Sequence, residues 1–178
     1  MANERDFEEA GGRRLYEGEV IDLDRQQFRF SADGKEVERE VIRHSGGVAI
    51  VVHDGTSVLL VRQPRPAIGE TDLLELPAGR LDHEGEDPLD TARRELAEEV
   101  GRSAERWTKL TSFYPSADVL DAEVHLFLAE ELGECEADSG EDERIEIVEW
   151  PLERIGEAIA ITRDAKTLIG LLMLQARL

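Results

Sequence analysis

Three glutamates lie close together in the stretch ARRELAEEVG at residues 92–101. In a helix, at about 100° per residue, Glu95, Glu98 and Glu99 project within roughly 100° of one another. Glu95 and Glu99 form an i,i+4 pair of like charges, which costs an isolated helix about 0.2–0.5 kcal/mol. Neither has a Lys or Arg four residues away to relieve it. The stretch is therefore either a solvated acidic face or a site that takes positive charge from outside the chain.

Clustered carboxylates of this kind suit a hard divalent cation such as Mg²⁺. Mg²⁺ binds through a few carboxylates, keeps several waters and takes further ligands from substrate phosphates. The Pro77-Ala78-Gly79 turn ahead of the helix could present backbone carbonyls to the same ion. Helix physics alone leaves both the metal site and the solvated face open.

Strong local signals mark the helix that carries these glutamates. Asp87 is a plausible N-cap, Pro88 suits the first helical position, and Gly101 suits a left-handed C-terminal residue. A buried stripe is expected at Leu89, Ala92, Leu96 and Val100. The three glutamates should then flank this stripe on a more exposed face.

The remaining pattern predicts strands on both sides of this one central helix. The first dozen residues are polar and are expected to be loose. Strands are expected within 14–41 (two or three, with a turn at 32–34), 46–63 (a hairpin at Asp54-Gly55), 73–79, 107–116, 123–132 and 144–150, and helices at 151–160 and 164–178. This order predicts an α+β domain, layered as an αβα sandwich.

Length and composition are those of one ordinary globular domain. The chain has 178 residues and is 40% apolar, enough for a sizeable core. No apolar run approaches the roughly 20 residues needed to span a bilayer, and the N-terminal residues lack the apolar region of a secretory signal. Cys135 is the only cysteine, so no internal disulfide can form. These features predict a cytoplasmic protein.

The charge balance is strongly acidic, with 41 acidic against 21 basic residues and a formal net charge of −20. Such a field argues against non-specific nucleic-acid binding and against an anionic membrane surface as partner. A phosphate-bearing substrate must therefore meet local arginines or bring cations with it. The acidity indicates either an ordinary soluble acidic protein or adaptation to high salt, where self-repulsion is screened.

Residues 79–102, GRLDHEGEDPLDTARRELAEEVGR, resemble the signature of the Nudix hydrolases. In that family a Gly is followed by a Glu and then, after seven intervening residues, by Arg-Glu-apolar-x-Glu-Glu-x-Gly-apolar. The matching positions are Gly79, Glu86, Arg94, Glu95, Leu96, Glu98, Glu99 and Gly101. Two positions depart from the pattern: six residues instead of five separate Gly79 from Glu86, and Arg102 stands at the final apolar position.

Outside this signature, the chain resembles the ADP-ribose pyrophosphatase branch over roughly residues 35–175. The similar segments are REVIRHSGGVAIVV, VRQPRP, LLELPAG, FYPSADVLDAEVHLFLA and the acidic loop before RIEIVEW. The loop at 116–118 departs, since the branch usually has a Pro-Gly turn there. The resemblance implies a Nudix fold at 44–178 with a mixed sheet between helices, and an N-terminal antiparallel strand region at 1–43. It also implies a homodimer, with the strands at 14–41 as the dimerisation element.

The resemblance implies metal-binding and catalytic roles for named residues. Glu95 and Glu99, with Glu98 as a further ligand and catalytic candidate, would bind Mg²⁺ (or Mn²⁺), joined by the Ala78 carbonyl. A Glu on the acidic loop of this branch orients or deprotonates the attacking water. Matching the loop to the strand that follows makes Glu143 the first choice and Glu141 the second.

Three further residues are candidates for substrate binding. Arg65 and Arg39 correspond to residues that contact the phosphates or terminal ribose, and Glu75 either faces the substrate or pairs with an Arg. Arg94 and Glu86 are expected to support the geometry of the loop and helix.

The resemblance implies Mg²⁺-dependent cleavage of ADP-ribose to AMP and ribose 5-phosphate. The alternatives are another nucleoside diphosphate sugar or modified nucleotide as substrate, or a non-catalytic ligand-binding module that keeps the fold.

Overall fold

The computed structural model describes residues 6–83, 85–135 and 144–178 and divides the chain into two compact units. The first unit comprises the described part of Met1–Gly46 together with Tyr114–Ala122. The second comprises Gly47–Phe113 and the described part of Glu123–Leu178. The sequence alone places one boundary after residue 43, whereas in the structure the Tyr114–Ala122 loop joins the N-terminal strands.

The first unit is built on a three-stranded antiparallel sheet in the order β1-β2-β3. Its strands are β1 (Phe7–Glu17), β2 (Asp22–Phe30) and β3 (Glu36–Arg43). The expectation that the first dozen residues are loose is wrong for the described ones, because β1 begins at Phe7. The polar composition of this segment did not indicate a strand. β1 is stabilised by its pairing with β2 and by Phe7, whose ring packs edge-on against Phe28 with the ring centroids 5.5 Å apart.

The Tyr114–Ala122 loop is fastened to the end of β3 by backbone and side-chain bonds. Ile42 N–H donates to the Val119 carbonyl at 2.7 Å, and Asp121 N–H donates back to the Ile42 carbonyl at 3.1 Å. The Arg43 guanidinium binds the Asp121 carboxylate at 3.1 Å. These bonds explain why a loop far along the sequence belongs to the first unit.

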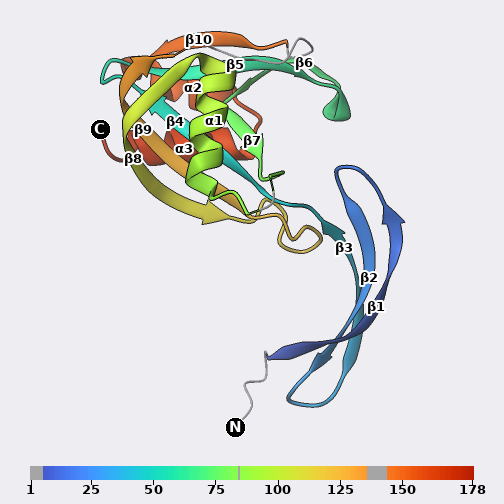
Figure 1. Cartoon of the computed structure of the whole chain (residues 1–178). Helices are drawn as coiled ribbons and strands as arrows, with labels where there is room; N and C mark the ends of the chain where they lie inside the picture. The colour runs from blue at the N-terminus through green and yellow to red at the C-terminus, as the bar shows by residue number, and fades with distance from the viewer. Residues whose placement is uncertain (1–5, 84, 136–143) are drawn as a thin grey trace. The chain divides into compact units, whose positions relative to one another are not determined.

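The second unit holds a seven-stranded mixed sheet and three α-helices (Figure 1). Its strands are β4 (Gly47–His53), β5 (Ser57–Arg65), β6 (Glu70–Glu75), β7 (Ala78–Arg80), β8 (Arg102–Phe113), β9 (Val124–Glu134) and β10 (Glu146–Pro151). Its helices are α1 (Pro88–Val100), α2 (Ile155–Ile161) and α3 (Ala165–Gln175), with short 3₁₀ turns η1 (Pro66–Ile68) and η2 (Leu152–Arg154).

Strand order in this sheet is β10-β5-β4-β9-β8, with β6 added beside β5 and β7 beside β4. The β4–β9 pair is parallel, and the other pairs are antiparallel. The expected hairpin at Asp54-Gly55 joins β4 to β5. Because β7 pairs with β4 directly after β6 ends, the Leu76-Pro77 segment carries the chain across the sheet to the start of the signature.

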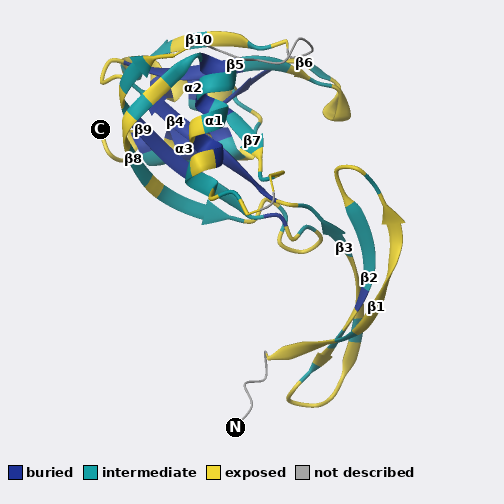
Figure 2. Ribbon diagram, in the orientation of Figure 1, coloured by how far each residue is buried: buried dark blue, intermediate teal, exposed yellow. Residues whose placement is uncertain are grey.

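The sheet is covered by helices on both faces, and β4 shows why. Successive side chains of a strand point to opposite faces. Val48, Ile50 and Val52 pack in the cluster that contains α1, whereas Ala49 and Val51 pack in the cluster that contains α2 and α3. Figure 2 shows β4 as buried, in agreement with its nearly continuous apolar sequence. The expected αβα sandwich with a mixed sheet is confirmed.

None of the described helices has both the length and the apolar character that crossing a membrane requires.

Candidate functional site

Helix α1 is fixed at both ends in the manner that its sequence predicts. The Asp87 carboxylate accepts the Leu89 N–H at 2.8 Å, Pro88 begins the helix, and Gly101 ends it at φ 64°. Its buried side includes Ala92, Leu96 and Val100 from the expected stripe, together with Thr91 and Glu99. A glutamate thus stands on the buried side of the helix, which hydrophobic periodicity does not predict.

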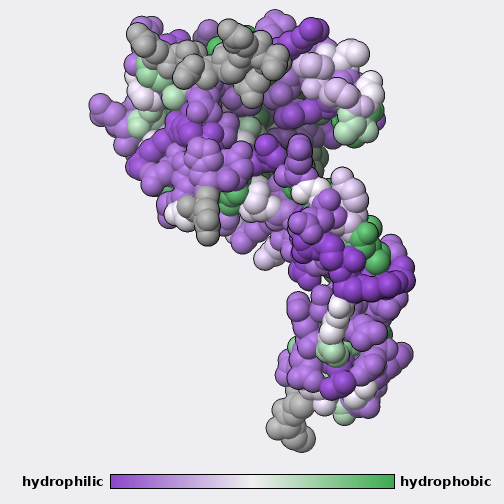
Figure 3. Space-filling view, turned by 45° about the vertical axis from the view of Figure 1, so that its right-hand side comes forward, coloured by the Kyte–Doolittle hydropathy of each residue, from purple (hydrophilic) through white to green (hydrophobic). Residues whose placement is uncertain are grey.

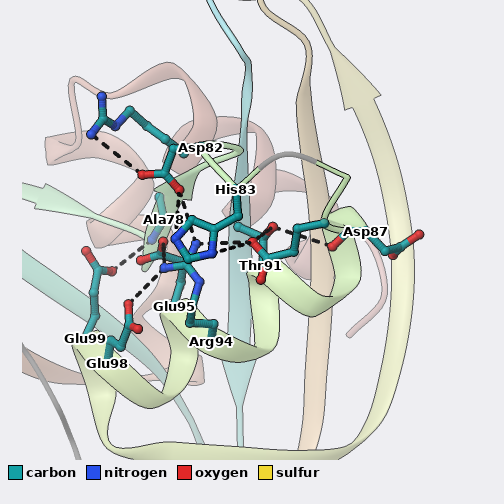
Figure 4. Close-up of polar contacts among 11 residues, drawn as sticks. Ala78, Asp82, His83, Asp87, Thr91, Arg94, Glu95, Glu98 and Glu99 are labelled. Carbon is teal, nitrogen blue, oxygen red and sulfur yellow. Dashed lines mark hydrogen bonds and ion pairs between the residues drawn. The ribbon is translucent and has the colours of Figure 1, made fainter. Parts of the chain in front are cut away.

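The Glu99 carboxylate is held against the backbone that precedes the signature loop. Only 8% of Glu99 is exposed, and its Oε2 accepts the Ala78 N–H at 2.9 Å. Figure 4 shows this bond linking α1 to the β7 segment. The hydrogen bond gives one predicted metal ligand a defined orientation beside another, since Ala78 was expected to contribute its carbonyl.

Glu95 lies against the next residue of the same segment. A Cβ built on Gly79 would come within 1.9 Å of Glu95 Cδ and 2.0 Å of Glu95 Oε1. A side chain at position 79 would fit only if the Glu95 carboxylate moved, so the glycine leaves Glu95 in its observed place. The Ala78-Gly79 backbone therefore touches both carboxylates of the i,i+4 pair.

Arg94 forms ion pairs with four acidic side chains of the loop and helix α1 (Figure 4). Its guanidinium lies 2.8 Å from Glu95 Oε1 and 3.0 Å from Glu98 Oε2, and more distantly contacts Glu86 at 3.5 Å and Asp82 at 3.6 Å. The Arg94 Nε atom is buried and has no hydrogen-bond partner among the described residues. Helical spacing reveals the bond to Glu98 but not the one to Glu95, because i,i+1 side chains do not normally face each other.

The pKa values of two carboxyl groups in this cluster are shifted in opposite directions. Burial raises the pKa of Glu95, an effect that the neighbouring Arg94 offsets only in part. The Thr91 hydroxyl donates to Glu86 at 2.8 Å and, with Arg94, lowers the pKa of the Glu86 carboxyl. Glu86 is thus held as an anion that supports the loop, and Glu95 is a carboxylate that a positive charge would stabilise.

The donor set fits a hard divalent cation. Glu95 and Glu99 offer carboxylate oxygens beside the Ala78-Gly79 backbone, and Gly79 leaves the space clear. Glu98, whose side chain is 36% exposed, is held by Arg94 at the edge of this set. In residues 6–83, 85–135 and 144–178, no three His, Cys, Asp or Glu side chains are already gathered as a metal site. A cation held by Glu95 and Glu99 would take further oxygen ligands from Glu98, from phosphate or from water.

Arg65 and Glu75 form a bidentate pair on the adjoining strands β5 and β6. Arg65 Nε and Nη2 donate to the two Glu75 oxygens at 2.6 and 2.9 Å. Glu75 has no exposed surface, and Lys166 contacts its carboxylate from α3 at 2.5 Å. The structure therefore shows Glu75 paired with an Arg, which was one of its two expected arrangements.

Lys166 is a neighbour of the site that the sequence analysis did not single out. It is one of only three lysines, and it lies two residues after Asp164, the N-cap of α3. Nothing in the local pattern indicates that its side chain reaches a carboxylate 91 residues away.

Arg39 belongs to the first unit, where it lines an apolar cavity of about 570 Å³. The cavity is walled by Phe28 and Val41 of the sheet and by Tyr114 of the loop, among others. Arg39 is exposed and donates to the Glu38 carbonyl at 2.8 Å. Glu141 and Glu143, the candidates for the catalytic base, lie outside the described residues, so the choice between them stays a prediction.

Comparisons with known proteins place this geometry in a family context. The sequence profile of the NUDIX domain matches residues 43–169. ADP-ribose pyrophosphatase of Bacillus subtilis (strain 168) is 38% identical over 169 residues, covering 92% of this chain and 90% of that protein. GDP-mannose pyrophosphatase of Cronobacter sakazakii (strain ATCC BAA-894) is 35% identical over 159 residues, covering 82% of each.

A solved structure supports the fold. The crystal structure of an ADP compounds hydrolase superposes with a TM-score of 0.84, covering 99% of this chain and 96% of that chain. At 20% sequence identity, this likeness bears on the fold alone.

Proposed function

Because this chain belongs to the NUDIX domain family, we propose that it hydrolyses the pyrophosphate bond of ADP-ribose to AMP and ribose 5-phosphate. The observation that carries the proposal is the packing of Glu95 and Glu99 against the Ala78-Gly79 backbone, within the matched family region. Similarity to the Bacillus subtilis ADP-ribose pyrophosphatase over nearly its whole length supports ADP-ribose as substrate.

Glu95, Glu99 and the Ala78 carbonyl would hold the divalent cation, with Glu98 as a further ligand. We propose Mg²⁺, with Mn²⁺ as a substitute, because the donors are all hard oxygens. Such a cation, when bound, neutralises phosphate charge and lowers the pKa of a coordinated water. The chain's own contribution is orientation: the Ala78 N–H fixes Glu99, and the Arg94 guanidinium holds Glu98 and Glu95.

Arg65 is the proposed anchor for a substrate phosphate. Its Nε and Nη2 atoms are bound to Glu75, but none of the described residues accepts a hydrogen bond from its Nη1 atom. A guanidinium fixed along one edge can still donate to a phosphate oxygen along another. Because Glu75 has no exposed surface and is bound to Arg65, its proposed contribution to substrate binding is indirect, through Arg65.

Deprotonation or orientation of the attacking water is assigned to the acidic loop. Glu143 stays the first candidate and Glu141 the second, with Glu98 on α1 as a further candidate. A glutamate in this role must lie within hydrogen-bond reach of the water, directly or through a second water. Replacing Glu143 and Glu141 one at a time by Gln, with kcat as the readout, distinguishes them.

The first unit is proposed to contribute both to the substrate site and to a homodimer. Arg39 at the edge of the apolar cavity is a candidate to contact a phosphate or the terminal ribose. Support for the dimer comes from apolar side chains exposed on or beside β1 and β2, among them Phe7, Leu15, Tyr16, Val20 and Ile21. Exposed apolar side chains on such a sheet favour its association with another apolar surface. A monomeric mass in light scattering would contradict the dimer.

One relative favours a second candidate function. Similarity to a GDP-mannose pyrophosphatase over 82% of the chain supports a different nucleoside diphosphate sugar as substrate. A non-catalytic module is less supported, because all three helix glutamates of the signature are present.

The test is a hydrolysis screen with Mg²⁺ over ADP-ribose, GDP-mannose and other nucleoside diphosphate derivatives. Release of AMP and ribose 5-phosphate with the highest kcat/KM for ADP-ribose is the expected result. A higher kcat/KM for GDP-mannose would transfer the proposal to the second candidate. Turnover of no member of the panel would reject the enzymatic function.

A further inference from the structure

Glu75 is a carboxylate with no exposed surface that is bound by two cations at once. Arg65 occupies both of its oxygens, at 2.6 and 2.9 Å, and Lys166 Nζ lies 2.5 Å from Oε2. A buried charge is tolerated only when it is well paired and hydrogen-bonded. One cation already provides a bidentate pair, so the second one calls for a separate explanation.

Lys166 is held in place by the start of α3. Its Nζ also lies 2.9 Å from Asp164 Oδ1, and the other Asp164 oxygen accepts the Thr167 N–H and hydroxyl at 2.9 and 2.6 Å. The Thr167 hydroxyl oxygen in turn accepts the Leu76 N–H at 2.8 Å. The start of α3 is therefore bonded to the residue that follows Glu75. These bonds fix the backbone from which the Lys166 side chain extends to the Glu75 carboxylate.

The second cation can restrict rotation of the Glu75 carboxylate about its last side-chain torsion. The last torsion of a Glu side chain joins an sp³ to an sp² atom, and its energy minima are broad. A bidentate Arg follows the plane of the carboxylate to which it is bound. A contact from Lys166 to one oxygen limits rotation of this plane and hence of the Arg65 guanidinium.

Arg65 lies where its orientation matters for chemistry. Its side chain is 40% exposed, and its pKa is raised first by the hydrogen bond to Glu75 and, among lesser causes, by the charge of Glu99. Arg65 is therefore within electrostatic reach of a proposed metal ligand. Among the described residues, no acceptor is bonded to the Arg65 Nη1 atom, which can therefore donate to an oxygen of a substrate diphosphate.

We propose that Lys166 is a positioning residue for substrate binding, acting through Glu75 to set the direction in which Arg65 meets a substrate phosphate. This inference rests on the proposed hydrolysis of a nucleoside diphosphate sugar. Lys166 itself touches no substrate, so its removal should weaken phosphate binding while leaving the bond-breaking step intact. Such a change raises KM with little effect on kcat.

The experiment compares Lys166→Met with Arg163→Met as its matched control. Arg163 also links the start of α3 to β6, through an ion pair with Glu70, and its loss removes the same charge without touching Glu75. With ADP-ribose and Mg²⁺, K166M should raise KM roughly tenfold with kcat within about twofold. R163M should leave KM and kcat within about twofold of their wild-type values. Lys166→Arg, which keeps the positive charge, should have a KM close to that of wild type.

A second readout does not depend on turnover. In protein labelled with ¹⁵N-arginine, loss of one Nε–H signal in Arg65→Lys assigns Arg65. That signal should shift or broaden in K166M and stay in place in R163M. If K166M does not fold, Lys166→Gln, which keeps a donor, is measured in the same two ways and should give a smaller change in the same direction.

The outcomes separate this inference from the proposed function. Wild-type protein that turns over no nucleoside diphosphate sugar defeats the proposed function, whatever the Arg65 signal does. Turnover with an unchanged KM and an unchanged Arg65 signal in K166M overturns the role of Lys166 alone. A fall in kcat without a rise in KM, or an equal KM rise in R163M, would also overturn it, because both indicate a merely structural contact.

Discussion

At the scale of single residues, the Glu95 side chain occupies the space that any side chain at position 79 would need. Gly79→Ala would place a methyl group 1.9 Å from Glu95 Cδ, so the carboxylate must move. We expect activity to fall by roughly 100-fold, because catalysis depends on placement of the reacting groups to within about 1 Å. Gly156→Ala on α2, where an added Cβ meets nothing within 4 Å, is the control and should keep full activity. Equal rates in the two variants would contradict the assigned role of Gly79.

The proposed cation site at Glu95 and Glu99 leads to a second residue-scale prediction. A cation that binds only the folded state, at a free concentration 100 times its dissociation constant, raises the free energy of unfolding by about 2.7 kcal/mol. For a chain of this size, that corresponds to a rise in Tm of roughly 5–10 °C. Glu95→Gln should reduce the rise caused by Mg²⁺, measured by calorimetry, whereas Glu105→Gln at an exposed position of β8 should not.

The pH dependence of this stabilisation follows from the raised pKa of Glu95. Metal binding needs the ionised carboxylate. Since burial raises this pKa, protons compete with the cation at a higher pH than they would at an ordinary Glu. The Mg²⁺-induced rise in Tm should therefore shrink as pH falls toward the acid range, and a constant rise would argue against Glu95 as a ligand.

The side-chain contacts show where sequence reasoning reached its limit. Glu95, Glu98 and Glu99 could be identified because helical spacing and the signature both fix their relative positions. An arginine partner for Glu75 was one of two alternatives, but neither Arg65 nor Lys166 could be named as its partner, since these bonds depend on how α3 and β5 pack against the end of β6. The contact between Arg94 and Glu95 was missed because a long, partly buried arginine folds back on its own neighbour.

At the scale of elements, local signals predicted what local interactions determine. Asp87, Pro88 and Gly101 set the ends of α1, and Asp54-Gly55 set the β4–β5 hairpin. β1 was missed because its alternation is weak and its stability comes from pairing with β2. Element boundaries that depend on distant partners were the least predictable.

The β4–β5 hairpin offers an element-scale prediction. Asp54 accepts three hydrogen bonds at 2.8 Å from Thr56 and Ser57, which lower its pKa below the ordinary value of 3.8. Asp54→Ala should reduce the free energy of unfolding by about 1–2 kcal/mol at pH 7, as expected for lost hydrogen bonds at an exposed turn. Asp72→Ala, which breaks an exposed ion pair with Arg62, should cost less than about 1 kcal/mol.

The sign of the pH effect follows from the lowered pKa. Ionised Asp54 stabilises the hairpin above pH 3.8, and this contribution is lost as pH falls through the lower pKa of the folded state. The difference in unfolding free energy between wild type and D54A, measured by urea titration, should therefore narrow between pH 5 and about 3. An unchanged difference at the acid end would show that the carboxylate charge is not involved.

At the scale of the whole molecule, charge dominates the surface. The net charge is −20, and hydrophilic residues make up most of the face seen in Figure 3. Repulsion among like charges destabilises the folded state in dilute buffer. Raising ionic strength from about 0.1 M to 1 M shortens the screening length from roughly 10 to 3 Å. If the acidity is an adaptation to high salt, Tm and activity should both rise from dilute buffer to molar KCl.

A charge-reduced variant tests whether repulsion is the cause of this dependence. Replacing the exposed Glu105, Glu146 and Glu153 by Gln lowers the net charge from −20 to −17 without altering the proposed site. The variant should melt at a higher temperature than wild type in dilute buffer, and the two should converge in molar KCl as screening removes the repulsion. Full wild-type stability and activity in dilute buffer, with no gain in the variant, would contradict the adaptation and leave an ordinary acidic protein.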